Sequence, residues 1–499
     1  MNKVATRKGR TFGIFAPIRS LPTDYCIGTL GKPAYEFIDW LKKARQNAWQ
    51  IWPFNYSSDT TQFSPYWLGS AFAGNLDLID PYLLKNDGLI ELIPEIPYSE
   101  RIDYKVVQEV QLKLLTEAFK KATSLGLLES EEFKSFVNEN AFWIDDYSFY
   151  MAYREFFKGL VPSVWEIPIM HREERAMNKY LNLFGLKDFG NRIEFFKFGQ
   201  FIFYQQFSKL KSYANQNGIK IIVDMPFYVA PESVDVWQHP ELFKVDKINL
   251  LPVAIGGCPP DDFSKDGQRW GFPVYNWDYH KKTNFEWFVK RVGHLFKYGD
   301  IVRFDHFRGF DQYYEIHACE KTARNGKWVS SPGKELFDAI KKALGPKEII
   351  LEDLGTLDEG VYELKDFLGY PGMKVSVWGW SKEGNEHTPS NWLVNSVGYT
   401  STHDSKSVVT SIKEAAKSRG INISEVLGIE LGERSIGMAA VEVAYASKAM
   451  YVIIPMNDAE SSEERFNTPG KVSEENWTLK VHTSPELATE FAELVEKYS

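Results

Sequence analysis

The residues best suited to chemistry in this sequence are an arginine and an aspartate, two positions apart in the short apolar run Asp300–Arg308. If the run is a β-strand, Arg303 and Asp305 point to one face of the sheet and Phe304 to the other. An arginine beside a carboxylate keeps that carboxylate ionised, as a nucleophile at neutral pH must be. A buried structural ion pair would show the same sequence pattern. Other parts of the chain are therefore needed to distinguish a catalytic pair from a structural one.

Acidic residues also end three other apolar runs, at Asp224, Glu352 and Asp404. Breaking a glycosidic bond takes one carboxylate at the sugar cation and one carboxylic acid at the leaving oxygen, roughly 5–5.5 Å apart in a retaining enzyme. The acid without a cation of its own stays protonated longer, which favours Glu352 as the acid and Asp305 as the nucleophile. Strand alternation alone cannot decide between Glu352 and its neighbour Asp353.

A metal site is the other use of several carboxylates at strand ends. His306 and His403 are single residues beside acids, where hydrogen-bonding groups are commoner than metal ligands. Cys26, Cys258 and Cys319 are widely spaced and form no CxxC pair, so neither a disulfide framework nor a zinc site is predicted. We therefore expect no metal and no cofactor.

Eight short apolar runs, bounded by turn residues, are the candidate strands. They are Thr11–Pro17, Ala48–Pro53, Ile219–Pro226, Asp300–Phe307, Glu348–Leu354, Val375–Gly379, Gly398–Asp404 and Met450–Met456. Helical patterns lie between most of them, at Ala34–Ala48, Asn284–Phe296, Lys334–Leu344, Glu359–Leu368 and Ile436–Ala449. Alternating strands and helices predict a parallel sheet, and eight such units predict a closed α/β barrel. In such a barrel the carboxyl ends of the strands form one ring, which would bring the acids to one ligand.

Two long stretches between the candidate strands predict insertions. Residues 81–215 are too many for a loop and have helical periodicity, so we expect a mostly helical insertion between strands 2 and 3. Residues 228–283 are rich in Pro, Gly, Asp and Trp and predict a loop-rich insertion over the active-site face. The segment after Met456 is too short for a C-terminal β-sandwich, so residues 1–499 are predicted to form a single catalytic domain.

Composition narrows the class of partner. The net charge of -9 and the lack of long basic runs argue against nucleic acid or an anionic membrane. No stretch approaches the ~18 consecutive apolar residues of a membrane span, and the apolar segment Phe12–Ile18 is too short for a signal peptide. These features predict a cytoplasmic protein. An aromatic share of 15% is compatible with a carbohydrate-binding groove, because sugar rings stack on aromatic faces.

Twelve short motifs, spread in order over nearly the whole chain, resemble those of the 4-alpha-glucanotransferases of the amylomaltase type, also called disproportionating enzymes. They are Gly13–Pro22, Ser64–Tyr66, Ser70–Asn75, Asp224–Ala230, Asp235–Trp237, Pro259–Asp261, Gly267–Gly271, Arg303–Gly309, Glu352–Gly355, Pro371–Val375, Thr402–Asp404 and Asn467–Gly470. The resemblance implies a TIM (β/α)8 barrel with inserted, mostly helical subdomains and no C-terminal β-sandwich. It also implies transfer of an alpha-1,4-glucan segment to the 4-hydroxyl of an acceptor, without a cofactor.

Carried over residue by residue, the resemblance makes Asp305 the nucleophile, Glu352 the general acid/base and Asp404 the carboxylate that holds sugar hydroxyls. Arg303 and His403 would support them. The positions that match glucan-contacting residues of the family are Asp224, Tyr66, Trp270, Gln268 and Asn467. For Tyr66 and Trp270 the alternative is ordinary packing. The expected partners are maltooligosaccharides, with glucose as an acceptor, and the expected state is a monomer or homodimer.

Transfer rather than hydrolysis requires water to be kept from the covalent intermediate, and Gly256–Phe263 is the predicted cover. The chain departs from the usual family pattern at Asn55–Phe63, Pro231–Glu232, Asp262, Phe272 and Ser405–Lys406. Two alternatives follow: an alpha-1,4-glucan hydrolase with the same acids, or a glucan-binding protein that has lost catalysis. Retention of Asp305, Glu352 and Asp404 argues against the second.

Overall fold

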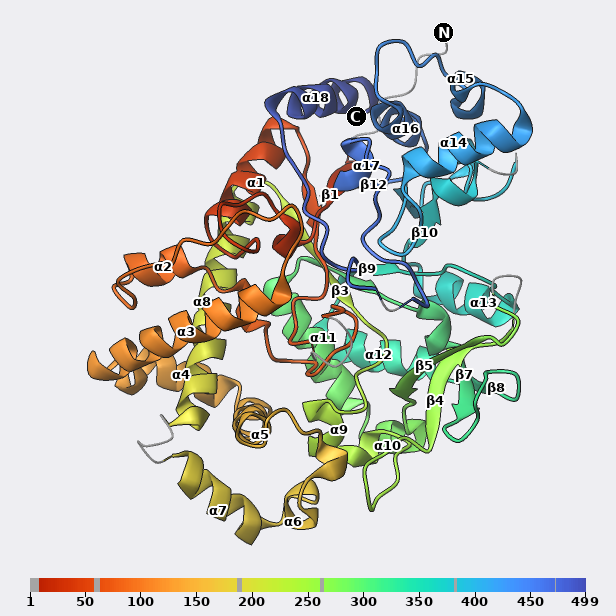
Figure 1. The fold of residues 1–499 in the computed structure, drawn as a ribbon. Coiled ribbons are helices and arrows are strands. Elements are labelled where there is room, and N and C mark those ends of the chain that lie inside the picture. Colours follow the sequence, from red (N-terminus) through yellow and green to blue (C-terminus); the bar gives the residue numbers. More distant parts are fainter. Residues whose placement is uncertain (1–8, 58–62, 186–190, 261–263, 381–383, 472) are drawn as a thin grey trace.

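Eight parallel strands close into a barrel at the centre of the molecule (Figure 1). The computed structural model describes residues 9–57, 63–185, 191–260, 264–380, 384–471 and 473–499. The barrel strands are β1 (Thr11–Phe15), β2 (Ala48–Gln50), β3 (Lys220–Met225), β6 (Ile301–Phe304), β9 (Glu348–Leu351), β10 (Gly372–Val375), β11 (Ser396–Tyr399) and β12 (Tyr451–Pro455). Their spatial order is β1-β12-β11-β10-β9-β6-β3-β2, and every neighbouring pair is parallel. The predicted TIM barrel is confirmed.

The barrel strands are buried on both faces, which explains why they read as continuous apolar runs. Every residue of β6, β10 and β11 is buried. The prediction was wrong for the sixth strand, which spans Gly372–Val375, whereas most of the predicted run forms a 3-10 helix, Ser376–Trp378. The reason is pairing: Gly372 lies between Leu351 of β9 and Ser396 of β11, so neighbouring strands set the register.

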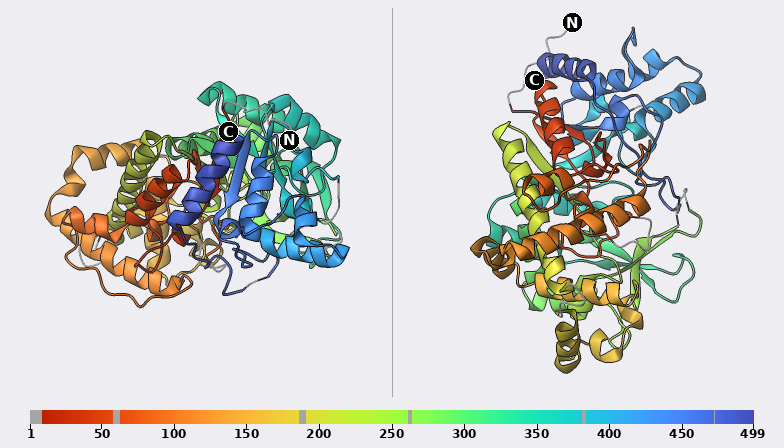
Figure 2. Two further views of the ribbon diagram at one scale, coloured as in Figure 1. Left: turned by 90° about the horizontal axis from the view of Figure 1, so that it is seen from above. Right: turned by 60° about the vertical axis from the view of Figure 1, so that its left-hand side comes forward.

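Helices surround the barrel (Figure 2). Those that follow or precede barrel strands are α1 (Lys32–Lys43), α8 (Arg192–Gln216), α11 (Glu286–Tyr298), α12 (Gly333–Leu344), α13 (Glu359–Leu368), α14 (Val408–Arg419), α15 (Ile423–Leu427), α16 (Ile436–Tyr445) and α17 (Met456–Ala459). Side-chain N-caps start several of them, including Asp358 of α13 and Ser407 of α14. The chain finishes with α18 (Pro485–Tyr498), which packs on α1, and the described residues after β12 contain no strand.

The stretch between β2 and β3 is helical over most of its length. It holds α2 (Pro81–Asn86), α3 (Tyr104–Ser124), α4 (Glu131–Glu139), α5 (Ile144–Phe156), α6 (Ile167–Met170), α7 (Glu174–Phe184) and α8. Aromatic side chains fill the interfaces between these helices and the inserted segments. Phe149 of α5, for example, stacks on Trp237 with ring centroids 5.8 Å apart. In Figure 1 these orange and yellow helices lie together on one side of the barrel.

A second sheet lies beside the barrel. It has four antiparallel strands in the order β5-β4-β7-β8: β4 (Ala254–Cys258), β5 (Gln268–Pro273), β7 (Gln312–His317) and β8 (Lys327–Ser330). Residues 228–283 therefore contain two strands as well as α9 (Val234–Gln238) and α10 (Trp277–Lys282), which differs from the predicted loop-rich layer. The two glycines of β4 hide the strand in sequence, and Gly257 is required because a Cβ there would lie 2.1 Å from the Gln268 carbonyl oxygen.

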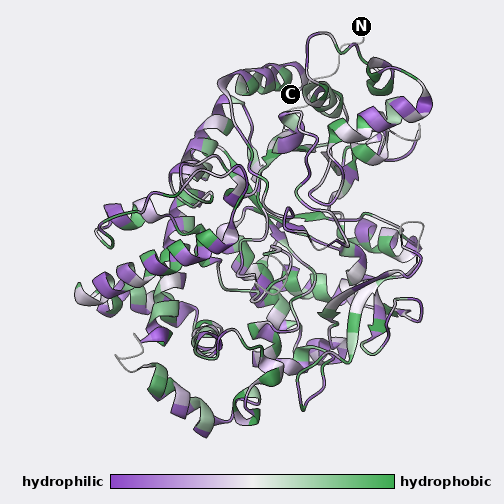
Figure 3. Cartoon of the chain, viewed as in Figure 1, coloured by the Kyte–Doolittle hydropathy of each residue, from purple (hydrophilic) through white to green (hydrophobic). Residues whose placement is uncertain are grey.

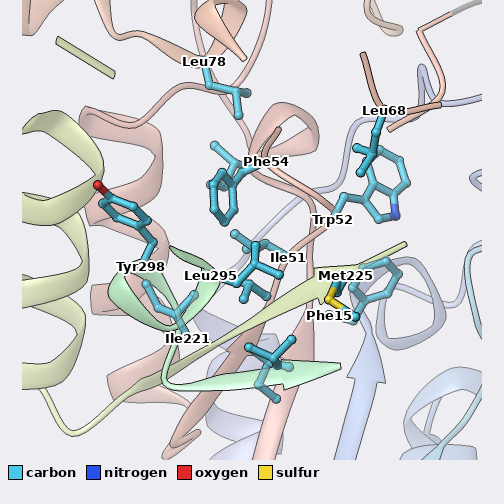
Figure 4. Packing of buried hydrophobic residues seen from close by; sticks show 14 of the residues in the cluster. Phe15, Ile51, Trp52, Phe54, Leu68, Leu78, Ile221, Met225, Leu295 and Tyr298 are labelled. Atoms are coloured by element: carbon cyan, nitrogen blue, oxygen red, sulfur yellow. The ribbon is translucent and has the colours of Figure 1, made fainter. Parts of the chain in front are cut away.

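Buried apolar side chains fill the space between the barrel and its helices. Figure 4 shows Ile221 of β3 near Tyr298 of α11, and Met225 of β3 beside Phe15 of β1. In Figure 3 hydrophilic and hydrophobic segments alternate along the outer helices, as expected for helices with one buried face. Among the described residues, no helix combines the length and the apolar character needed to cross a bilayer.

Candidate active site

The predicted pair Arg303 and Asp305 faces one way and forms an ion pair. Arg303 Nη1 donates to Asp305 Oδ1 at 3.0 Å and lies 2.8 and 2.7 Å from the two carboxylate oxygens of Asp224. Strand pairing causes this, because Arg303 of β6 lies opposite Asp224 of β3. Burial alone would lower the pKa of Arg303, but the charges of Asp224 and Asp305 raise it well above its ordinary value. The buried guanidinium is therefore a permanent positive charge beneath Asp305, whose side chain keeps 25% exposure.

Glu352 meets this pair at the end of the neighbouring strand β9. Its Oε2 accepts a hydrogen bond of 2.7 Å from the backbone N–H of His306, the residue directly after Asp305. His306 has φ of 47°, and this left-handed backbone, rare for a non-glycine residue, accompanies the N–H···Glu352 contact. Burial and then the charge of Asp305 raise the pKa of Glu352 well above its ordinary value, although Arg303 opposes the shift. The site thus pairs a carboxylate held by an arginine with a carboxyl group that retains its proton.

Asp353 points away from this pair, which settles the choice that strand alternation left open. It is buried, and its Oδ1 accepts the Met373 backbone N–H at 2.6 Å while its Oδ2 accepts Lys365 Nζ at 2.7 Å. Asp353 therefore joins the end of β9 to β10 and α13. Glu352 is the one of the two acids that faces Asp305.

Asp404 stands at the rim of the site with two hydrogen-bond donors. His403 Nε2 lies 3.2 Å from its Oδ2, and Asn467 Nδ2 donates to its Oδ1 at 2.6 Å. Desolvation alone would raise the pKa of Asp404, but the charge of His403 and these hydrogen bonds lower it to about 2. Tyr66 connects this group to the floor of the site: its ring stacks on His403 at 4.5 Å, and its hydroxyl donates to Asp224 Oδ2 at 2.8 Å.

The antiparallel sheet supplies the remaining two predicted residues. Trp270 of β5 donates from Nε1 to Gln268 Oε1 at 3.0 Å, and both side chains are half-buried. The ring of Trp270 meets that of His306 edge-on, with centroids 5.0 Å apart. Because His306 also binds Glu352, the second sheet reaches the acids of the barrel through one residue.

The ten predicted site residues therefore form one connected network, but Asp224 has a different place in it from the one predicted. Asp224 is fully buried, and its two oxygens are taken by Arg303 and Tyr66. In this structure both carboxylate oxygens of Asp224 therefore face other side chains of the protein. Asp224 instead fixes the side chains of Arg303 and Tyr66, a consequence of β3 pairing with β6 that its sequence motif did not reveal.

Several residues of the network were missed in the sequence. His306 was interpreted as a hydrogen-bonding residue and was not assigned to the site, yet its backbone orients Glu352. Trp477 packs against Tyr66 and His403, with ring centroids 5.8 and 6.0 Å away, and Arg465 donates to the backbone carbonyl groups of Asp404 and Asn467. Arg465 could have been found from the sequence, because it lies two positions before the motif that begins at Asn467. Nothing in the sequence pointed to Trp477, because it lies in a segment without hydrophobic periodicity.

Two further expectations concern segments described only in part. The predicted cover Gly256–Phe263 begins within β4, and its residues 261–263 lie outside the described residues. The divergent segment Asn55–Phe63 includes residues 58–62, which are also outside them. In the described part of the chain, no group of three or more His, Cys, Asp or Glu side chains is arranged to hold a metal ion.

Enzymes that act on glycosidic bonds use a pair of carboxyl groups, and a (β/α)8 barrel whose strand ends bring two such groups together over a buried arginine fits this class. Comparison with known families makes this specific. The family model described as 4-alpha-glucanotransferase, glycoside hydrolase family 77, matches residues 16–485. The chain belongs to this family of 4-alpha-glucanotransferase enzymes, as the sequence motifs predicted.

Known 4-alpha-glucanotransferases are similar to this chain over nearly its whole length. A 4-alpha-glucanotransferase of Aquifex aeolicus is 39% identical over 476 residues, which cover 95% of each chain. A 4-alpha-glucanotransferase of Thermus thermophilus is 34% identical over 502 residues, which cover 98% of each chain. Among solved structures, an amylomaltase from Streptococcus agalactiae in complex with acarbose superposes with a TM-score of 0.91 at 34% identity, over 98% of this chain and 99% of that one.

Proposed function

We propose that this enzyme transfers a segment of an alpha-1,4-glucan to the 4-hydroxyl of another glucan or of glucose, by a retaining double displacement. The observation that carries the proposal is the 2.7 Å hydrogen bond from His306 N–H to Glu352, because it holds Glu352 to a residue 46 positions away in sequence that directly follows Asp305. Two adjacent carboxyl groups with different environments are what acid-assisted displacement at a sugar carbon requires.

In the first step, Asp305 attacks the anomeric carbon and forms an ester with the donor segment. The bond to the leaving oxygen breaks, and Glu352 gives its proton to that oxygen, so the departing chain leaves as a neutral alcohol. The raised pKa of Glu352 keeps this proton available near neutral pH. Arg303, held by Asp224, fixes the position of the Asp305 carboxylate through the hydrogen bond that it donates.

In the second step, the same groups exchange roles. Glu352, now ionised, takes the proton from the 4-hydroxyl of the acceptor, and the resulting oxygen attacks the anomeric carbon and releases Asp305. Two inversions at that carbon restore the alpha configuration. If water takes the place of the acceptor, the outcome is hydrolysis with the same acids.

The residues around the two acids suggest where the sugars bind. We assign Asp404 and Asn467 to hydroxyl groups of the sugar that is attacked, because their hydrogen-bonding atoms lie together at the open rim. Trp270 and Gln268 are assigned to the sugar beyond the scissile bond, since the indole lies next to His306 on the Glu352 side. Maltooligosaccharides are the proposed substrates, in agreement with the acarbose complex of the Streptococcus agalactiae protein.

Incubation with maltotriose tests transfer against hydrolysis. We expect glucose together with oligomers longer than maltotriose, resolved by anion-exchange chromatography, and we expect neither from an Asp305→Asn control. Exclusively shorter products would identify a hydrolase. Binding of maltotriose without any turnover would identify a glucan-binding protein and contradict the proposal.

A further inference from the structure

A second cavity lies away from the catalytic residues, and none of them lines it. Its volume is about 930 Å³, within the range of pockets that hold small molecules. Its walls come from the end of α6 at Met170, from α9 at Trp237, from the start of β4 at Ala254 and from α10 at Tyr279. In Figure 1, α6, α9 and α10 gather at the bottom of the molecule, far from β1 and β12.

The lining of this cavity is basic, although the chain as a whole carries a net charge of -9. Five basic side chains and one carboxylate take part: His171, Arg172, Lys244, Lys247 and His317, with Glu241. Arg172 pairs with Asp146 and Lys244 with Glu315, at 2.5 and 2.6 Å. Within the described part of the chain, no carboxylate lies within ion-pair distance of Lys247, which is exposed. The lining thus carries three cations, Arg172, Lys244 and Lys247, against one carboxylate, and this excess of positive charge in an acidic protein favours an anionic ligand.

The rest of the lining is apolar and aromatic. Trp237, Phe243, Leu250, Val253 and Tyr279 form part of the wall. The guanidinium of Arg172 lies over the Trp237 ring, 4.7 Å from its centroid, so one cation is fixed at the apolar wall. Next to the cavity the chain exposes Ile248 (74%) and Leu251 (49%). An inorganic anion would leave this apolar surface unused, and a neutral glucan would leave the cations unused.

We propose that this cavity binds a phosphate monoester carried on a ring-sized organic body, the chemistry shared by sugar phosphates and nucleoside monophosphates. The basic side chains, with Lys247 as the available charge, bind the phosphate, and the wall formed by Phe243, Leu250 and Tyr279 covers the organic body. The site is separate from the glycosidic chemistry, so its occupancy does not depend on the mechanism proposed above.

Isothermal titration calorimetry with glucose 1-phosphate and adenosine monophosphate tests the proposal and separates the two sources. We expect at least one of them to bind more tightly than inorganic phosphate, and Lys247→Glu to weaken that binding about tenfold, or about 1.4 kcal/mol. The matched control is Lys282→Glu, an exposed position on α10 outside the cavity, which should change binding less than about twofold. Turnover of maltotriose should be unchanged in both variants, which shows that they fold.

Three results would overturn the proposal. They are binding of neither organic phosphate, equal weakening by Lys247→Glu and Lys282→Glu, and binding of inorganic phosphate as tight as that of the organic phosphates. The first would show that the cavity has no such ligand, the second that the effect is one of net charge, and the third that the apolar wall takes no part.

Discussion

The two sheets of this molecule contribute to the same site in different ways. The barrel strands β3, β6 and β9 are almost completely buried and place Arg303, Asp305 and Glu352 through their pairing. The antiparallel sheet is more open: β8 is mostly exposed, and β5, which carries Gln268 and Trp270, is only half-buried. Under the proposed function, this difference assigns the chemistry to the buried barrel and sugar recognition to the more open second sheet.

The comparison predicts its largest effect at the barrel. Asp305→Asn keeps the shape of the side chain and its place beside Arg303 but removes the attacking charge. We expect kcat with maltotriose to fall by on the order of 10⁴-fold or more, while the affinity for maltotriose stays within a few-fold. Steady-state kinetics and calorimetry measure the two quantities. A rate near that of the unmodified enzyme would show that Asp305 is not the nucleophile.

A smaller effect is expected on the second sheet. Trp270→Ala removes a ring that we assign to sugar binding, so kcat/KM should fall by about 10–100-fold, chiefly through KM. The control is Trp328→Ala, on β8 of the same sheet, where the ring is 40% exposed and packs on Arg308. This control should leave KM unchanged. If both variants raised KM equally, the sheet would act through its stability and not through Trp270.

The smallest effect concerns stability and pH. The pKa of Glu352 is raised in the folded protein, so folding favours the protonated form, and stability is lost as pH rises from about 4.5 through the raised value. Glu352→Gln cannot ionise. We expect this variant to melt roughly 1–3 °C above the unmodified enzyme at pH 8 and to show no such gain at pH 4, by calorimetry. A gain of the same size at both pH values would contradict a buried charge as its cause.

The sequence predicted the barrel because its strands are buried on both faces and read as apolar runs. It also predicted Arg303 and Asp305 on one face from their spacing alone. The ends of the other apolar runs supplied the remaining acids, and the family motifs assigned a role to each of them. The sixth strand was misplaced because Val375–Gly379 is as apolar as a strand, whereas the observed Gly372–Val375 is defined by its neighbours. The residues of a strand do not by themselves reveal which strands it pairs with.

The antiparallel sheet could not be predicted from the sequence, again because its strands are defined by their partners. Its strand β4 includes two adjacent glycines, and its partner β7 lies more than 50 residues further along the chain. The left-handed backbone of His306 was also unpredictable, since any residue but glycine is rare there. The buried position of Asp224 depends on the register between β3 and β6, which only the folded chain defines.

The central claim is that Asp305 forms a covalent bond with the donor sugar while Glu352 handles the proton. Its most direct test is to incubate Glu352→Gln with alpha-maltosyl fluoride, whose leaving group needs no proton, and to analyse the peptic peptides by mass spectrometry. The account predicts that the ester accumulates, because the acceptor lacks its base, and that the peptide containing Asp305 gains the mass of one maltosyl group. A modified peptide that lacks Asp305, or fluoride release without any covalent adduct, would contradict it.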